Sequence, residues 1–128
     1  DGNCLFHSLA YGLGGEKAAS LRRKVCDFLC EHPALDISGT SLEEWVQMSA
    51  QCSVEEYARR MQRSGEWGGA PEIAVCARMK GVDVHVYEPR GSDFALVAPF
   101  CGSEDGVACA RVVRVVYSGR MHYDALAM

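Results

Sequence analysis

Apolar residues recur at helical spacing through the first two-thirds of the chain. Leu5, Leu9 and Leu13 stand four residues apart, which places them on one face of a helix closed by a cluster of glycines. A second apolar face occupies residues 21–29 and stops before Pro33, a residue that does not continue a helix. The pattern therefore predicts two amphipathic helices within the first 33 residues.

Three further helices are predicted from their end signals. Ser41–Glu44 and Ser53–Glu56 both have the spacing of a capping box, in which a hydroxyl and a carboxylate satisfy N–H groups at a helix start. Pro71 suits the first turn of another helix, and Gly81 suits its end. We expect short helices after Ser41 and Ser53 and a longer one between Pro71 and Gly81.

The last third of the chain changes to a period of two. Val82, Val84 and Val86 alternate with polar or amphipathic residues, as in a strand with one buried face. A turn is predicted at residues 89–91, and Pro99 is expected to end the next strand. The remaining strands are predicted over residues 94–98, 112–117 and 122–126. Helices followed by strands indicate an α+β fold.

Composition and charge narrow the classes of function. The chain has 128 residues, 48% of them apolar, and 13 Lys and Arg against 17 Asp and Glu give a net charge of −4. We expect one soluble globular domain over residues 1–128, with sequence upstream of Asp1 missing. Without a basic run, neither nucleic acid nor an anionic membrane surface is an expected partner. No apolar stretch approaches the roughly 20 residues of a membrane span, and no signal peptide is recognisable.

Seven cysteines at irregular spacing cannot all pair, so at least one thiol is free. We expect a reducing compartment, either the cytoplasm or the nucleus, and thiols that mostly pack in the core. Cys26, Cys30 and His32 form a possible metal set, but no second pair completes a zinc site, so core packing is favoured. Cys101 and Cys109 are expected to be reduced rather than bridged. Neither a metal nor a cofactor is predicted.

Cys4 is the first candidate for chemistry, because turn-forming residues precede it and an amphipathic helix follows it. At a helix start, the helix dipole and the N–H groups favour a thiolate, which is a nucleophile. The same N–H groups can receive a developing oxyanion, and Gly2 permits a close approach of the backbone. By spacing alone, a cysteine that merely packs beneath the helix is an equal alternative.

His122 is the second candidate because Asp124 follows it at strand spacing, so that both side chains project to one face. A carboxylate there can fix the imidazole tautomer and leave the other ring nitrogen to take a proton from a thiol. The alternative is an ordinary surface His-Tyr-Asp sequence. The separation of 118 positions between Cys4 and His122 is no obstacle, because such pairs meet only in the fold.

The chain resembles the ovarian tumour (OTU) family of cysteine proteases in five segments, which in chain order are DGNCLFHSLAYGL, LRRKVCDFL, Tyr57 to Met61, EWGGAPEIAVCARMKGVDVHVY and HYDAL. The segments together span nearly the whole chain. The resemblance implies a papain-like α+β fold with a central, mostly antiparallel sheet packed between helices. It also implies a thiol-dependent deubiquitinase acting on ubiquitin, polyubiquitin chains or ubiquitinated proteins. The alternatives are an inactive ubiquitin-binding module and a cysteine peptidase for other substrates.

By the same resemblance, Cys4 is the nucleophile, His122 is the general base and later acid, and Asp124 orients the histidine. Asp1 competes for the orienting role, but we favour Asp124 because it shares a strand face with His122. The family also forms an oxyanion hole from backbone amides ahead of the nucleophile, which here are those of Asp1, Gly2 and Asn3. The segment from Ala34 to Thr40 departs from the family pattern.

The Trp67-Gly68-Gly69 segment matches a family block that we interpret as structural. We expect a buried aromatic side chain followed by a tight turn. A wall of the substrate channel is the less favoured alternative.

Overall fold

A computed structural model describes residues 3–37, 39–63, 66–118 and 122–126 of the chain. Its helices are α1 (Cys4–Leu13), α2 (Ala18–Glu31), α3 (Leu42–Ala50), α4 (Val54–Met61) and α5 (Ala70–Lys80). Its strands are β1 (Asp36–Ile37), β2 (Thr40–Ser41), β3 (Asp83–Arg90), β4 (Asp93–Phe100), β5 (Val112–Ser118) and β6 (His122–Ala125). The helices therefore precede the main sheet along the chain, as the sequence predicted.

The predicted helix starts after Ser41 and Ser53 and the predicted helix end at Gly81 are confirmed. The Ser41 hydroxyl accepts the N–H of Glu44 at 3.3 Å, and the Ser53 hydroxyl accepts the N–H of Glu56 at 3.2 Å. Gly81 ends α5 with a φ of 65°, in the left-handed region where a glycine costs least.

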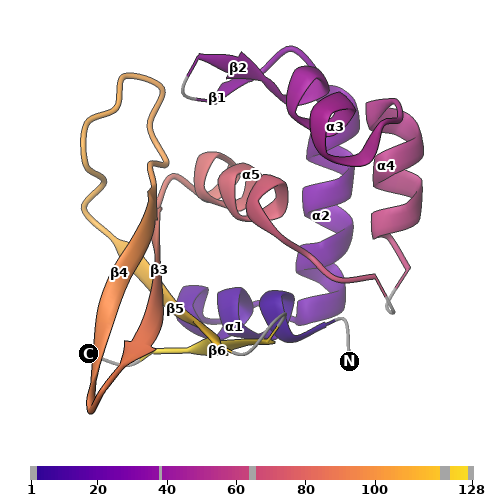
Figure 1. The fold of residues 1–128 in the computed structure, drawn as a ribbon. Helices are drawn as coiled ribbons and strands as arrows, with labels where there is room; N and C mark the ends of the chain where they lie inside the picture. Colours follow the sequence, from indigo (N-terminus) through magenta and orange to yellow (C-terminus); the bar gives the residue numbers. More distant parts are fainter. Residues whose placement is uncertain (1–2, 38, 64–65, 119–121, 127–128) are drawn as a thin grey trace.

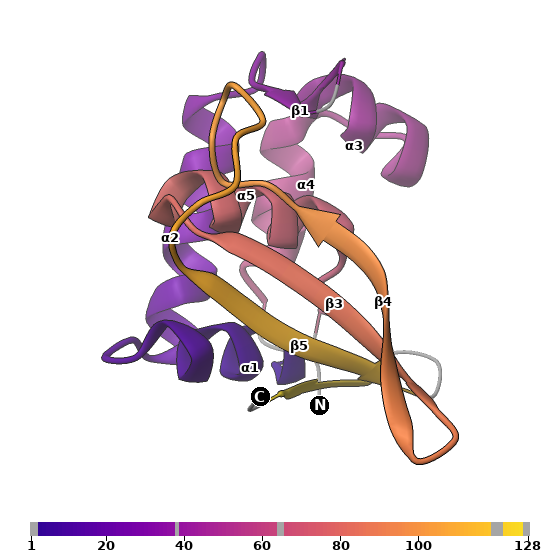
Figure 2. The same cartoon turned by 90° about the vertical axis from the view of Figure 1, so that its left-hand side faces the viewer.

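The main sheet has the strand order β4-β3-β5-β6. β3 pairs antiparallel with β4 and parallel with β5, and β5 pairs antiparallel with β6. The predicted α+β fold with a mostly antiparallel sheet is thus confirmed. Figures 1 and 2 show a twisted main sheet with α1 and α5 lying along the same side of it. The small β1-β2 sheet lies near α3, at the opposite end of the molecule from β6 (Figure 1).

Pro89 and Pro99 both lie inside strands of the β3–β4 hairpin, contrary to the prediction. Pro89 pairs with Phe94, and Pro99, which was expected to end its strand, pairs with His85 inside β4. Because β4 is an edge strand of the sheet, Pro99, which has no N–H, can be accommodated there.

Asp83 is also placed differently from the prediction, since the alternating pattern assigned it to the exposed face. Its side chain is buried, and its carboxylate accepts the N–H groups of Gly102 at 3.0 Å and Cys109 at 3.1 Å. Burial raises the pKa of Asp83, but these hydrogen bonds outweigh it and hold the pKa below its usual range. The carboxylate therefore fastens the loop between β4 and β5 to the start of β3.

The core lies between the helices and the sheet and includes Cys26, Cys52 and Cys76. Burial raises the pKa of Cys26 and of Cys76 to about 12, so both remain thiols at neutral pH. All seven cysteines are free, including Cys101 and Cys109. Among the described residues, no group of three histidine, cysteine or acidic side chains is suited to hold a metal ion. No helix in the described part of the chain has the length and apolar character of a membrane span.

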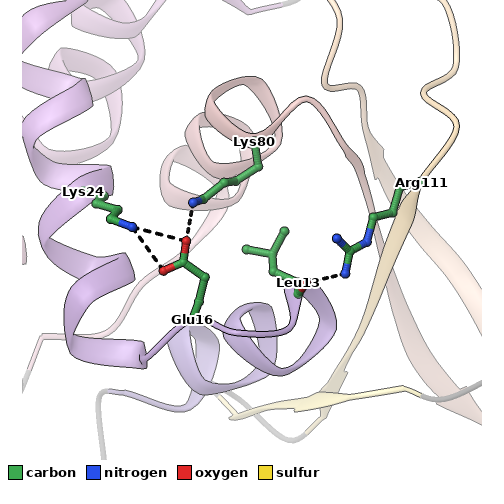
Figure 3. A network of polar contacts seen from close by, with 5 residues as sticks. All are labelled: Leu13, Glu16, Lys24, Lys80 and Arg111. Carbon is green, nitrogen blue, oxygen red and sulfur yellow. Dashed lines mark hydrogen bonds and ion pairs between the residues drawn. The ribbon is translucent and has the colours of Figure 1, made fainter.

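The C-terminal end of α1 is fastened to three other elements (Figure 3). Arg111, just before β5, donates to the carbonyl oxygens of Gly12, at 2.8 Å, and Leu13. Glu16, just after α1, pairs with Lys24 of α2 at 3.3 Å and with Lys80 of α5. The hydrogen bond from Lys80 is the main cause that lowers the pKa of Glu16. These contacts fix the direction of the helix that begins at Cys4.

Candidate active site

Cys4 occupies the first position of α1 and is half-buried. Its Sγ accepts the backbone N–H of Tyr123, a residue of β6, at 3.4 Å. The contact joins residues 119 positions apart and places the sulfur against the strand that carries His122 and Asp124.

His122 and Asp124 lie on β6 and contact each other, with 3.0 Å between Nε2 of the imidazole and Oδ2 of the carboxylate. Both side chains are more than half exposed, at 55% and 69%. With Nε2 held by the carboxylate, Nδ1 is the ring nitrogen left for the thiol. Asp1, the competing carboxylate, lies outside the described residues, so the choice of Asp124 over Asp1 stays a prediction.

Of the predicted oxyanion loop, the structure describes Asn3, whereas Asp1 and Gly2 lie outside the described residues. The Asn3 carbonyl oxygen accepts the N–H of His7 at 2.9 Å, so it points along α1. Because a trans peptide is planar with its C=O and N–H opposed, the N–H of Cys4 points out of the helix start. This N–H is suited to receive an oxyanion that forms beside Sγ.

Two contributors to the site were missed by the sequence analysis. Tyr123 acts through its backbone N–H, and no residue type marks such a donor in a sequence. Arg22 of α2 is buried, and its guanidinium donates to the side-chain oxygen of Asn3. Its signal was available, because Arg22, Cys26 and Leu29 share one helical face and the latter two are core residues.

The Tyr123 side chain packs at 4.9 Å from the ring of Tyr117 on β5. Burial raises the pKa of Tyr123 to about 12, so its phenol is neutral at physiological pH. The ring pair therefore supports the middle residue of the His-Tyr-Asp sequence, whose N–H reaches Cys4.

The Trp67-Gly68-Gly69 segment lies next to α1, but the prediction of a buried Trp67 is wrong, since its side chain is 39% exposed. Gly68 is the member that packs tightly. A Cβ on Gly68 would stand 2.7 Å from Leu5 Cδ2 and 3.2 Å from the ring of Phe6. The segment thus supports the start of α1 through a glycine contact rather than through its aromatic residue.

Beside Asp124, a cavity of about 590 Å³ opens between α1, the β3–β4 hairpin and β6. Tyr11 and Phe94, which line it, are 74% and 44% exposed. The candidate site therefore adjoins an open surface with exposed aromatic side chains.

Comparison with known proteins identifies matches along nearly the whole chain. Residues 1–124 match the family model of the OTU-like cysteine proteases. The chain is 29% identical to OVARIAN TUMOR DOMAIN-containing deubiquitinating enzyme 3 of Arabidopsis thaliana, over 98% of this chain and 64% of that protein. It is 30% identical to the ubiquitin thioesterase otu2 of Schizosaccharomyces pombe, over 71% of this chain and 31% of that protein. The chain thus spans less than two-thirds of the length of these relatives.

A solved structure with the same fold is that of the Hazara virus OTU bound to ubiquitin. It has a TM-score of 0.73 and 23% sequence identity, over 99% of this chain and 77% of that chain. At this identity, the likeness establishes the fold.

Proposed function

The chain belongs to the family of OTU-like cysteine proteases, and on this premise we propose that it is a deubiquitinating thiol hydrolase. It would hydrolyse the bond after the C-terminal glycine of ubiquitin or of a ubiquitin-like modifier. Relatives named as deubiquitinating enzymes and ubiquitin thioesterases support this substrate class. The observation that carries the proposal is the contact of Cys4 Sγ with β6, the strand on which His122 contacts Asp124.

The first half of the reaction forms a thioester. His122 takes the proton of Cys4 through Nδ1, and the thiolate attacks the carbonyl carbon of the terminal glycine. The carbonyl π electrons move to the oxygen, which the N–H of Cys4 is placed to stabilise. When the tetrahedral intermediate collapses, the C–N bond breaks and His122 gives its proton to the leaving lysine amine.

The second half hydrolyses the thioester. His122, now neutral, takes a proton from a water molecule as the water oxygen attacks the thioester carbonyl. The C–S bond then breaks, the modifier leaves as a carboxylic acid that gives its proton to solvent, and the sulfur regains its proton from His122. Asp124 holds the ring through Nε2 in both halves and stabilises the imidazolium between them.

A reducing compartment, the cytoplasm or the nucleus, is proposed as the place of action. The free state of all seven thiols supports this proposal. A fluorescent fusion of the full-length protein tests it, and a secreted, disulfide-linked product would contradict it.

Hydrolysis of ubiquitin that carries a fluorophore in amide linkage at its C-terminal glycine tests the function. We expect turnover by the wild type and none by Cys4→Ala or His122→Ala. Cys30→Ala is the matched control, because this thiol is exposed and is not part of the site. Binding without turnover would indicate an inactive ubiquitin-binding module, and equal cleavage of a short peptide amide with the same tail would indicate a general cysteine peptidase.

A further inference from the structure

Arg22 is a charged residue inside the helical layer behind the candidate active site. Its side chain lies on α2 with 3% of the residue exposed, and the guanidinium carbon stands 4.4 Å from the centre of the Phe6 ring. Burial of a charged side chain costs folding free energy unless its hydrogen-bond donors are paired with acceptors. The acceptors of the Arg22 guanidinium therefore matter for its role. Desolvation accordingly lowers the pKa of Arg22, although nearby acidic groups oppose the effect.

One edge of the guanidinium holds the residue that precedes the nucleophile. Nε and Nη2 both donate to the side-chain oxygen of Asn3, at 3.2 and 2.9 Å. Two donors from a rigid, planar group fix the direction of this oxygen more closely than a single donor does.

The other donors bind the segment that leads from α4 to Trp67, Gly68 and Gly69. Nη1 donates to the carbonyl oxygens of Met61 at 2.6 Å and Arg63 at 2.9 Å, and Nη2 donates to that of Glu66 at 3.0 Å. A single buried cation thus ties the start of α1 to a segment more than 50 residues further along the chain.

The Asn3 side chain does not cap α1, although asparagine usually caps a helix from this position. Asn3 is the N-cap residue of α1, yet its side chain makes no capping hydrogen bond to the helix. An N-cap asparagine ordinarily accepts an N–H from the first turn. With Asn3 directed to Arg22 instead, its oxygen does not compete with a substrate oxyanion for the N–H groups at the helix start.

We propose that Arg22 is a positioning residue for the thiol reaction. It holds Asn3 in the non-capping orientation, and thereby fixes the Asn3–Cys4 peptide whose N–H receives the oxyanion. This inference rests on the proposed function, because it assigns Arg22 to the oxyanion-forming step of that reaction. Arg22 itself touches neither the nucleophile nor the substrate in this assignment.

The test compares Arg22→Lys with a variant of matched burial. Lysine keeps the charge and most of the buried stem, but it has one nitrogen and cannot form the two-donor contact with Asn3. We expect kcat to fall by about 10- to 100-fold, with KM within about twofold, because the geometry for the transition state is lost while the binding surface is intact. Val25→Ala on the same helix removes fully buried volume but no hydrogen-bonding group, so its kcat should stay at the wild-type value below its melting temperature.

A double variant separates positioning from simple support of the fold. If Arg22 acts through Asn3, then Asn3→Ala alone lowers kcat, and adding it to Arg22→Lys causes little further loss. Asn3→Asp, which keeps an acceptor for the guanidinium, should lose less than Asn3→Ala. Independent, multiplying losses, or a kcat loss in Val25→Ala equal to that in Arg22→Lys, would overturn the proposal.

Acylation of Cys4 by p-nitrophenyl acetate keeps this inference separate from the choice of substrate. This small ester forms an oxyanion but requires no recognition of ubiquitin, and mass spectrometry locates the acetyl group. If the wild type is acylated at Cys4 but does not cleave ubiquitin, the substrate assignment fails, while a slower acylation of Arg22→Lys still supports positioning. Equal acylation rates for the wild type and Arg22→Lys overturn the positioning role. Absence of acylation in the wild type overturns both.

Discussion

Glu72 is a fully buried carboxylate on α5, and its ionisation should make the stability of the protein depend on pH. Its Oε1 accepts the N–H of Gly69 at 2.7 Å, and its Oε2 accepts the hydroxyl of Tyr57 at 2.5 Å. Burial raises the pKa of Glu72 from 4.5 to about 7, against the opposing effect of these hydrogen bonds. A rise of this size corresponds to roughly 3 kcal/mol of folding free energy.

The direction of the pH dependence follows from the protonation state of Glu72 that the folded protein prefers. Because the folded pKa is raised, the stabilising contribution of Glu72 is fully present below pH 4.5 and is lost as the pH rises through about 7. Glu72→Gln cannot ionise, and its amide oxygen can still accept from Gly69 while its NH₂ group donates to Tyr57. The free energy of unfolding of Glu72→Gln minus that of the wild type should therefore rise by roughly 3 kcal/mol between pH 4.5 and pH 8.5.

Urea unfolding followed by tryptophan fluorescence, at several pH values across this range, measures the difference. Other titrating groups are common to both proteins and cancel in the subtraction. Glu55→Gln, an exposed carboxylate on α4, is the control and should give a nearly flat difference. If the difference for Glu72→Gln is equally flat, the raised pKa is refuted.

Three further predictions concern the site and its surroundings. Gly68→Ala should destabilise the protein by about 1–3 kcal/mol, because the added Cβ meets Leu5 of α1. A Cβ at Gly69 meets no atom within 4 Å, so Gly69→Ala is the control. Equal melting temperatures of the two variants in thermal unfolding would contradict the close packing of Gly68 on α1. Asp124→Asn should lower kcat by on the order of 10- to 10⁴-fold with KM little changed, and steady-state kinetics giving normal turnover would remove Asp124 from its orienting role. Tyr11→Ala, in the wall of the cavity beside the site, should raise KM for ubiquitin substrates by about 10-fold. Met48→Ala on α3, which changes a comparably exposed residue, is the control and should leave KM unchanged. The same KM for both variants would exclude the Tyr11 surface from ubiquitin binding.

Local signals predicted the helices because each signal acts within a few residues. The capping serines Ser41 and Ser53 satisfy N–H groups three positions away, and both helices begin where expected. The errors concern features that depend on distant partners. Whether Pro99 ends a strand depends on β4 being at the sheet edge, and whether Asp83 is buried depends on N–H groups 19 and 26 residues further along.

The candidate site likewise contains residues that the sequence indicates and residues that it does not. Cys4, His122 and Asp124 are marked by residue type, spacing and family resemblance, and the structure brings their elements together. The N–H of Tyr123 belongs to the backbone and has no sequence signal. The role of Arg22 depends on carbonyl acceptors 39, 41 and 44 positions away, which no local pattern indicates.

We propose that Cys4 attacks the carbonyl at the C-terminus of ubiquitin. Ubiquitin with a thiol-reactive group in place of its terminal carboxylate tests this proposal, because it reacts only where recognition of ubiquitin and a nucleophile coincide. We expect one covalent adduct, located at Cys4 by peptide mass spectrometry, abolished in Cys4→Ala and strongly reduced when the last glycine of ubiquitin is replaced by a bulky residue. An adduct at another of the seven cysteines, or none with the wild type, would contradict it.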